Sequence, residues 1–408
     1  MDRKEDLILD VTPDVKWIGI LDYDIVTFDI VMSTEYGTTY NSYFINADKK
    51  TIVETAKAKY SDGYLTKVRA VCNPSELEYI VLNHTEPDHS GSLRYLLEIA
   101  PEATVVGSGN AIRYLTDIVG KPFKYIVAKE GDTLDLGNKT LKFISAPNLH
   151  WPDSMFTYLE EDRLLFTCDS FGAHYCKPLM FDDLVDDYSE SFKYYFDVIL
   201  KPFSKFMLKA IEKIRPLDIS MICPGHGPIL RSTWKKKVDI TERYALEYIQ
   251  DSTVRSKPTV LIMYVSAYGY TKQMAAHLKK GIEETGDVNA EMLDIEEISL
   301  GDLDSRLVLS DALLVGSPTI NQNTLLPIYR LFSVINPLRD RGKHAAAFGS
   351  FGWSGEAPRI ITDVLKGLKL KVVEEPASYK FSPDNDKEIS LVEYGKQFSL
   401  RLLEDCGQ

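Results

Sequence analysis

The chain has 408 residues, of which 44% are hydrophobic and 26% charged, so it is long enough for two or three domains with separate cores. Its net charge of −13 argues against a broad surface for nucleic acid or anionic membrane. No apolar run approaches the roughly 20 residues of a membrane span, and the start, MDRKEDLILD, lacks the apolar stretch of a signal peptide.

The five cysteines form no C-x-x-C pair, which excludes a sulfur-only zinc or iron site and fits a reducing compartment. We therefore expect a cytoplasmic protein in which nitrogen and oxygen atoms hold any bound metal.

The first 250 residues alternate between predicted strands and helices. The apolar run 77–83 is typical of a buried strand, and residues 92–100 have helical spacing. Two more strands are predicted at 103–108 and 140–147, a hairpin at 155–168 that turns at 160–162, and a last strand at 219–224.

The segment NHTEPDHSG follows the first of these strands, and Pro87 in its middle predicts a loop or turn. Other residues of ligand type also stand just beyond predicted strands, where a sheet gathers side chains at one edge. The seven candidates are His84, Glu86, Asp88, His89, His150, Asp169 and His226. Four imidazoles and three carboxylates suffice for two metals that share a bridging carboxylate.

The order H-x-E-x-D-H, then His, Asp and His, resembles the metallo-β-lactamase fold, an αβ/βα sandwich with a dinuclear site. The resemblance implies that His84, Glu86 and His150 hold one metal and that Asp88, His89 and His226 hold the other, with Asp169 bridging them. Zinc hydrolases of this fold have histidine where this chain has Glu86. A carboxylate there favours iron or manganese over zinc.

Two further residues, His174 and Cys168, lie near this set without belonging to it. His174 either shapes the substrate pocket from behind the ligands or is an ordinary buried histidine. Cys168 precedes Asp169, so on an extended chain its side chain faces away from the metals and belongs to the core.

The polar segment 251–258 opens a new pattern, so the expected domains are 1–250 and 251–408. Apolar strands then alternate with amphipathic helices, which predicts a doubly wound parallel sheet. The loop SAYGYT enters a helix whose unpaired N–H groups suit a phosphate, and its spacing resembles the FMN phosphate loop of flavodoxins. Two further loops, 317–324 and 350–355, follow strands at the expected places.

The resemblance to flavodoxins implies a set of FMN contacts on these three loops, with Trp353 offering a flat face for stacking. The residues are Ser266, Tyr268, Gly269, Thr271, Pro318, Thr319, Asn321, Ser350, Gly352, Trp353 and Gly355. Tyr268 stands where flavodoxins usually have threonine.

A lactamase-like domain with Glu86, joined to a flavodoxin-like domain, resembles the flavodiiron proteins (A-type flavoproteins) without a rubredoxin domain. The resemblance implies two non-haem iron ions and FMN as cofactors. It implies reduction of dioxygen to water or of nitric oxide to nitrous oxide, with electrons from an external donor such as rubredoxin, a flavin reductase or a deazaflavin coenzyme. It also implies a head-to-tail homodimer or a dimer of dimers.

Two other classes stay open. A metallo-hydrolase with a regulatory flavin module would use zinc and be indifferent to flavin reduction, and Glu86 argues against it. An electron-transfer protein with the metal domain as a mere scaffold would not need the complete ligand set.

Overall fold

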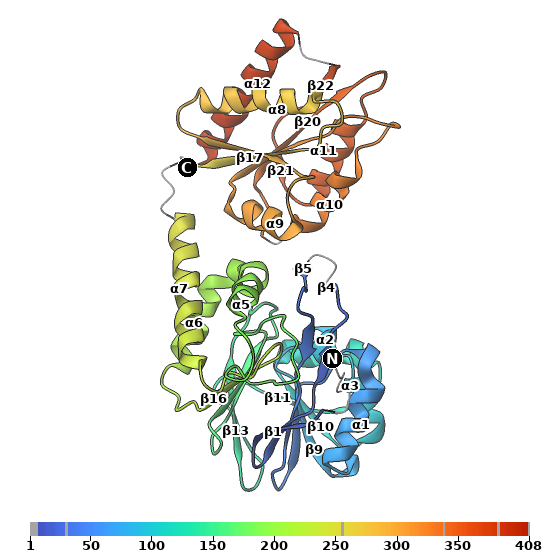
Figure 1. Cartoon of the computed structure of the whole chain (residues 1–408), viewed down its shortest axis with the longest axis vertical. Coiled ribbons are helices and arrows are strands. Elements are labelled where there is room, and N and C mark those ends of the chain that lie inside the picture. The colour runs from blue at the N-terminus through green and yellow to red at the C-terminus, as the bar shows by residue number, and fades with distance from the viewer. Residues whose placement is uncertain (1–6, 29–31, 254–256, 338, 382–383, 407–408) are drawn as a thin grey trace. The chain divides into compact units, whose positions relative to one another are not determined.

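The computed structural model describes residues 7–28, 32–253, 257–337, 339–381 and 384–406 (Figure 1). Two compact units make up the chain, and the division along the sequence falls between Gln250 and Asp251. Helix α7 (Trp234–Thr253) extends through the first residues of the polar segment that begins at Asp251. Among the described residues, no helix is both long enough and apolar enough to cross a membrane.

The first unit contains two mixed sheets. In the described part of the chain, one sheet has the order β1 (Leu9–Thr12), β2 (Val15–Trp17), β7 (Tyr43–Ile45), β8 (Lys50–Val53), β9 (Leu77–Val81), β10 (Thr104–Gly107), β11 (Lys124–Val127). The other has the order β12 (Thr133–Asp135), β13 (Thr140–Ser145), β14 (Met155–Leu159), β15 (Leu164–Cys168), β16 (Met221–Pro224). Two short pairs join β3 (Ile20–Asp22) to β6 (Thr38–Tyr40) and β4 (Thr27–Phe28) to β5 (Met32–Ser33).

The two sheets face each other across one core. Trp17 and Val81 of the first sheet share a hydrophobic cluster with Phe143 and Phe166 of the second. The helices of this unit are α1 (Ser61–Val71), α2 (Pro87–Ser90), α3 (Leu93–Ile99), α4 (Gly109–Val119), α5 (Ser189–Tyr195), α6 (Ser204–Ile214) and α7. This arrangement is the predicted αβ/βα sandwich, with most ligand candidates in the loops that leave β9, β13, β15 and β16.

The second unit is a parallel sheet with helices on both faces. Its strands are β17 (Thr259–Tyr264), β18 (Asn289–Asp294), β19 (Ala312–Gly316), β20 (His344–Phe351), β21 (Lys371–Val372) and β22 (Ala377–Lys380). The order β18-β17-β19-β20-β21, with β22 also paired to β20, confirms the doubly wound fold.

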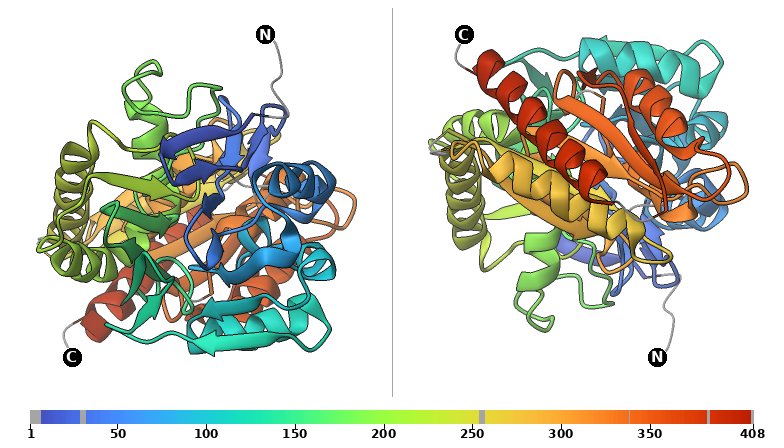
Figure 2. Two further views of the ribbon diagram at one scale, coloured as in Figure 1. Left: turned by 90° about the horizontal axis from the view of Figure 1, so that it is seen from below. Right: turned by 90° about the horizontal axis from the view of Figure 1, so that it is seen from above.

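Alternate residues of β17 supply two separate cores. Val260 and Ile262 pack beneath α8 (Tyr270–Glu283) and α12 (Asn385–Cys406), which lie side by side on one face (Figure 2). Leu261 and Met263 pack on the opposite side. The helices there are α9 (Leu300–Leu309), α10 (Leu326–Val334) and α11 (Ala357–Gly367). Covering both faces is what the continuous apolar strands require.

Candidate functional sites

The loop after β9 turns directly into the short helix α2. Pro87 occupies the first helical position, where its missing N–H forfeits no helical hydrogen bond. The prediction of a loop throughout this segment is therefore wrong for Pro87–Ser90. The helical turn presents Asp88 and His89 to the interior, and both are almost completely buried.

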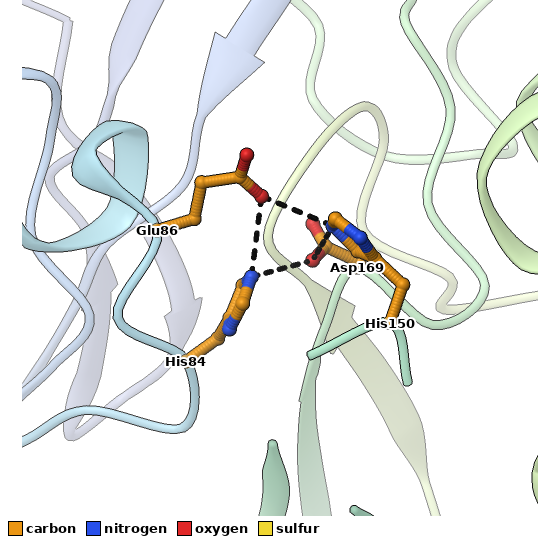
Figure 3. Close-up of side chains that lie close together, drawn as sticks. All are labelled: His84, Glu86, His150 and Asp169. Atoms are coloured by element: carbon orange, nitrogen blue, oxygen red, sulfur yellow. Dashed lines mark hydrogen bonds and ion pairs between the residues drawn. The ribbon is translucent and has the colours of Figure 1, made fainter. Parts of the chain in front are cut away.

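Four of the predicted ligands meet in one group (Figure 3). Glu86 Oε2 lies 3.3 Å from His84 Nε2 and 3.0 Å from His150 Nε2. Asp169 Oδ2 lies 3.5 Å from His84 Nε2 and 3.6 Å from His150 Nε2. All four ligand atoms lie within 4.8 Å of one another.

The other three predicted ligands form a second group around the opposite oxygen of Asp169. Asp88 Oδ2 lies 3.4 Å from His89 Nε2 and 3.1 Å from His226 Nε2. Asp169 Oδ1 lies 3.1 Å from His89 Nε2 and 3.5 Å from His226 Nε2. The two carboxylate oxygens of Asp169 thus face the two groups separately.

Partners behind the imidazoles fix which ring nitrogen faces the site. His84 Nδ1 lies 3.3 Å from the Asp153 carboxylate, which also accepts hydrogen bonds from the Thr85 amide at 2.8 Å and the Thr85 hydroxyl at 2.7 Å. His226 Nδ1 donates to the Thr39 carbonyl at 2.5 Å. Such partners hold a metal-binding ring in one tautomer and one orientation.

Buried charges of both signs hold each other in the ionised form. Burial opposes ionisation of Asp88 and Glu86, but the neighbouring imidazoles outweigh it and lower the pKa of each carboxyl to about 2. Burial likewise lowers the pKa of His89, but Asp88 and Asp169 overcome it and raise this pKa to about 10. In addition, Asp88 Oδ1 and Asp169 Oδ2 have no hydrogen-bond partner among the described residues. Divalent cations in place of the imidazole protons would coordinate both the ring nitrogens and these carboxylate oxygens, so the residues fit a metal centre.

Two residues that the sequence did not indicate complete this environment. Asp153 lies 69 positions from His84, and Tyr195 donates from its hydroxyl to Asp169 Oδ1 at 3.0 Å across 26 positions. Both contacts depend on tertiary packing. For Asp153, the only signal in the sequence was its position shortly after the predicted ligand His150.

His174 lies beside the metal groups without joining either of them. Its ring centroid is 5.4 Å from that of His226, and Nδ1 is 2.9 Å from the Thr38 hydroxyl. Its Nε2 has no hydrogen-bond partner among the described residues, and burial lowers the pKa of the ring well below its usual range. His174 also borders a cavity with Glu35 and Glu190. This position fits both interpretations of His174, a residue that shapes the substrate pocket from behind the ligands and an ordinary buried histidine.

An open pocket in the second unit gathers much of the predicted FMN set. Seven of its lining residues were predicted: Tyr268, Pro318, Thr319, Asn321, Ser350, Gly352 and Trp353. The Trp353 side chain is 76% exposed, so one flat face is free for a ligand. Three separate loops thus converge at the carboxyl edge of the sheet.

The other four predicted residues do not line the pocket and instead shape its loops. Ser266 Oγ accepts the Lys272 amide at 3.2 Å, and Thr271 Oγ1 lies 2.9 Å from Ser350 Oγ. Gly269 caps α8 with a φ of 84°, a conformation that favours glycine. A Cβ on Gly355 would lie 3.0 Å from Ser378 Oγ, so this glycine permits close packing.

Phe381 is a further lining residue that the sequence did not indicate. It follows β22, outside the three loops of the flavodoxin pattern, and its ring lies 6.3 Å from that of Tyr270. The remaining unpredicted lining residues are Tyr270, Ile320, Gln322, Phe351 and Ser354.

Comparison with known families divides the chain as the fold does. The profile described as ODP family beta lactamase matches residues 38–227, and the flavodoxin profile matches residues 262–395. Both predicted fold resemblances are confirmed.

Relatives match over nearly the whole length. The chain is 41% identical over 388 residues to the flavo-diiron protein FprA2 of Clostridium acetobutylicum, which covers 94% of this chain and 96% of the relative. It is 38% identical over 396 residues to the type A flavoprotein fprA of Rhodobacter capsulatus, covering 96% and 90%.

Solved structures also match this chain over almost its whole length. The flavodiiron protein of Giardia intestinalis superimposes with a TM-score of 0.70 at 29% identity, covering 98% of both chains. Rubredoxin oxygen:oxidoreductase of Desulfovibrio gigas superimposes with a TM-score of 0.71 at 27% identity, covering 98% of this chain and 100% of the other. The chain therefore belongs to the flavodiiron proteins, a family of oxidoreductases that pair FMN with a non-haem diiron site.

Proposed function

We propose that this protein reduces dioxygen to water, nitric oxide to nitrous oxide, or both, with electrons relayed through FMN to two iron ions. The observation that carries the proposal is the position of Asp169, whose two oxygens face two separate groups of ligand-type side chains. Such an arrangement suits two metals that share one carboxylate.

The proposed ligands follow the two groups. His84, Glu86 and His150 would hold one iron, and Asp88, His89 and His226 the other, with Asp169 between them. Glu86 gives the first iron a harder ligand than histidine would, which favours iron over zinc and so reduction over hydrolysis.

When bound, the iron pair would supply two electrons and reduced FMN two more, which equals the four electrons needed to convert dioxygen and four protons to two waters. Two nitric oxide molecules need two electrons and two protons to give nitrous oxide and water. The protein residues hold the site ready for either reaction. Asp153 and the Thr39 carbonyl fix the tautomers of His84 and His226 so that each Nε2 faces the site.

The flavin would bind in the pocket of the second unit. The N-terminus of α8, which begins at Tyr270, would present backbone N–H groups and the positive end of the helix dipole to the phosphate. Trp353 supplies a face for the ring system, and Thr319 and Asn321 line the same pocket.

The electron donor is proposed as a class. Any external protein or coenzyme that reduces FMN would serve, including rubredoxin, a flavin reductase or a deazaflavin coenzyme. We also propose a head-to-tail homodimer, or a dimer of such dimers, in which the flavin of one subunit serves the iron pair of the other.

The test is an anaerobic assay of the iron- and FMN-replete protein with a chemically reduced donor, followed with oxygen and nitric oxide electrodes in parallel. Consumption of at least one gas is expected, and Asp169→Ala should abolish it while FMN stays bound. Consumption of neither gas by the replete protein would refute the proposal. Hydrolysis of an ester or lactam by the zinc-loaded protein, unaffected by flavin reduction, would favour the hydrolase alternative instead.

A further inference from the structure

In the two groups of predicted ligands, the Nδ1 atoms of His84 and His89 face different partners. His84 Nδ1 faces the Asp153 carboxylate at 3.3 Å. His89 Nδ1 instead faces a sulfur, since Cys168 Sγ lies 3.6 Å away. Both rings turn Nε2 toward the acidic side chains, so in each case Nδ1 is the nitrogen left to donate a proton.

Cys168 reaches His89 because its backbone is not extended. Its φ of 48° is left-handed, and the pairing of β15 with β16 shifts register between Phe166 and Cys168. The expectation that this side chain faces away from the metal site is therefore wrong. A left-handed conformation is costly for a residue with a Cβ and persists where the surroundings enforce it, often at functional sites.

The space behind His89 is also closely fitted. A Cβ on Gly225 would lie 2.6 Å from His89 Cε1, so only glycine leaves room for the ring. The Gly225 amide donates to the Cys168 carbonyl at 2.6 Å, which ties the two backbones together. A Glu54 oxygen, a His89 nitrogen and the Cys168 sulfur lie within 4.8 Å of one another, and Glu54 also has a left-handed φ, of 61°.

We infer that Cys168 is a positioning residue whose sulfur accepts the Nδ1–H of His89 and so fixes Nε2 toward Asp88 and Asp169. The inference rests on the proposed function only in taking His89 as a metal ligand.

This arrangement makes the two metal positions unequal. An imidazole that donates to a carboxylate is a more basic ligand than one that donates to a cysteine sulfur, which is a weak acceptor. A metal held by His84 would therefore receive more electron density than a metal held by His89, even though each group contains two histidines and one carboxylate of its own.

The test uses the full-length protein stripped of metal and reloaded with cobalt(II), whose paramagnetism shifts the proton resonances of its ligands. Wild type is expected to bind two cobalt ions and to show shifted, solvent-exchangeable N–H resonances from its ligand histidines. Cys168→Ala should move or exchange-broaden one of them, and Cys168→Ser, which retains an acceptor, should restore a sharp resonance at a new shift. The control is Cys223→Ser, which changes a buried cysteine of the hydrophobic core.

The outcomes separate the two proposals. Failure of wild type to bind two cobalt ions would overturn the proposed ligand set itself. Two bound ions with an unchanged spectrum in Cys168→Ala, or an equal change in Cys223→Ser, would overturn the role of Cys168 alone. Glu54→Gln should leave the His89 N–H resonance in place. If this resonance is lost in Glu54→Gln but unchanged in Cys168→Ala, the acceptor is Glu54 and not Cys168.

Discussion

The Tyr195 hydroxyl donates a hydrogen bond to Asp169 Oδ1 at 3.0 Å, and both side chains are almost completely buried. Asp169 is the only residue of the seven candidates that faces both groups, so its carboxylate orientation decides whether two metals can share it. Tyr195 holds that orientation from α5, an element distant in sequence from the loop that carries Asp169.

Tyr195→Phe should keep the ring packing and lose only the hydroxyl. Because a hydrogen bond to a buried charged group is worth about 1.5–3 kcal/mol, the unfolding free energy of the metal-free protein should fall by roughly that amount. Urea denaturation followed by circular dichroism measures the change. Two metals per chain should still bind, since Tyr195 is not a proposed ligand.

The matched control is Tyr188→Phe. The Tyr188 hydroxyl is also buried but has no hydrogen-bond partner among the described residues. Its removal should change the unfolding free energy by less than half as much. Equal losses in both variants would show that the Tyr195–Asp169 bond contributes nothing specific.

Asp153→Asn should weaken metal binding while leaving the proposed ligands in place. The amide has the same shape as the carboxylate but supports the His84 imidazole with less negative charge. Removing such a partner typically lowers metal affinity roughly 10- to 100-fold. Competition with a chromophoric chelator measures the affinity.

Asp182→Asn provides the comparison for Asp153→Asn. Asp182 is another buried carboxylate that accepts backbone amides, those of Arg231 at 3.0 Å and Thr233 at 2.6 Å. Its substitution should lower stability and leave the metal affinity of the folded protein unchanged. An equal loss of affinity in both variants would contradict a specific role for Asp153.

Most of the candidate metal ligands could be predicted from the sequence because they stand close to predicted strands. His84, Glu86, Asp88 and His89 stand next to a strongly apolar strand, and strands bring their loops to one edge. Contacts that depend on tertiary packing could not be predicted from the sequence. Tyr195 and Phe381 reach their sites from separate elements.

Two expectations failed for reasons of backbone conformation. Pro87 suggested a loop, yet proline is well suited to the first position of a helix, which it occupies. Cys168 was expected to face the core on an extended strand, but a left-handed φ turns its sulfur toward His89. Single-residue conformations of this kind leave no periodic pattern in a sequence.

Because Lys237 is buried, we expect the free energy of unfolding to depend on pH even in the metal-free protein. Burial lowers its pKa from 10.5 to about 8, while its Nζ lies 4.1 Å from the Tyr188 ring and 4.2 Å from the Phe192 ring. The folded pKa is thus below the unfolded one, so the unfolded chain binds more protons between about pH 8 and 10.5. The contribution of Lys237 to the free energy of unfolding should therefore rise as the pH increases through that window.

Lys237→Met should remove this rise. The variant should gain stability over wild type at pH 7.5, by at most about 3 kcal/mol for a shift of this size, and the gain should shrink toward pH 10.5. Urea denaturation of the metal-free protein across this range measures it, with exposed Lys235→Met as the control. A gain that does not vary with pH would contradict the shifted pKa.

If the proposed head-to-tail dimer forms, two inactive variants should complement each other. Asp169→Ala lacks the proposed bridging carboxylate, and Gly352→Trp fills the proposed flavin pocket with a large side chain. In a mixed dimer, the flavin of the first variant would serve the intact metal site of the second. Activity should appear after the two are unfolded and refolded together but not after each is refolded alone. Its absence from verified mixed dimers would contradict electron transfer between subunits.

A single-turnover experiment on the protein loaded with two irons and one FMN per chain tests the proposed gas reduction most directly. The fully reduced protein is mixed anaerobically with limiting dioxygen or nitric oxide, and flavin and iron oxidation are followed together by stopped-flow absorbance. If the proposed function is correct, at least one gas oxidises both cofactors, yielding water without free hydrogen peroxide from dioxygen, or nitrous oxide from nitric oxide. Oxidation of the flavin alone with release of peroxide, or no oxidation by either gas, would contradict it.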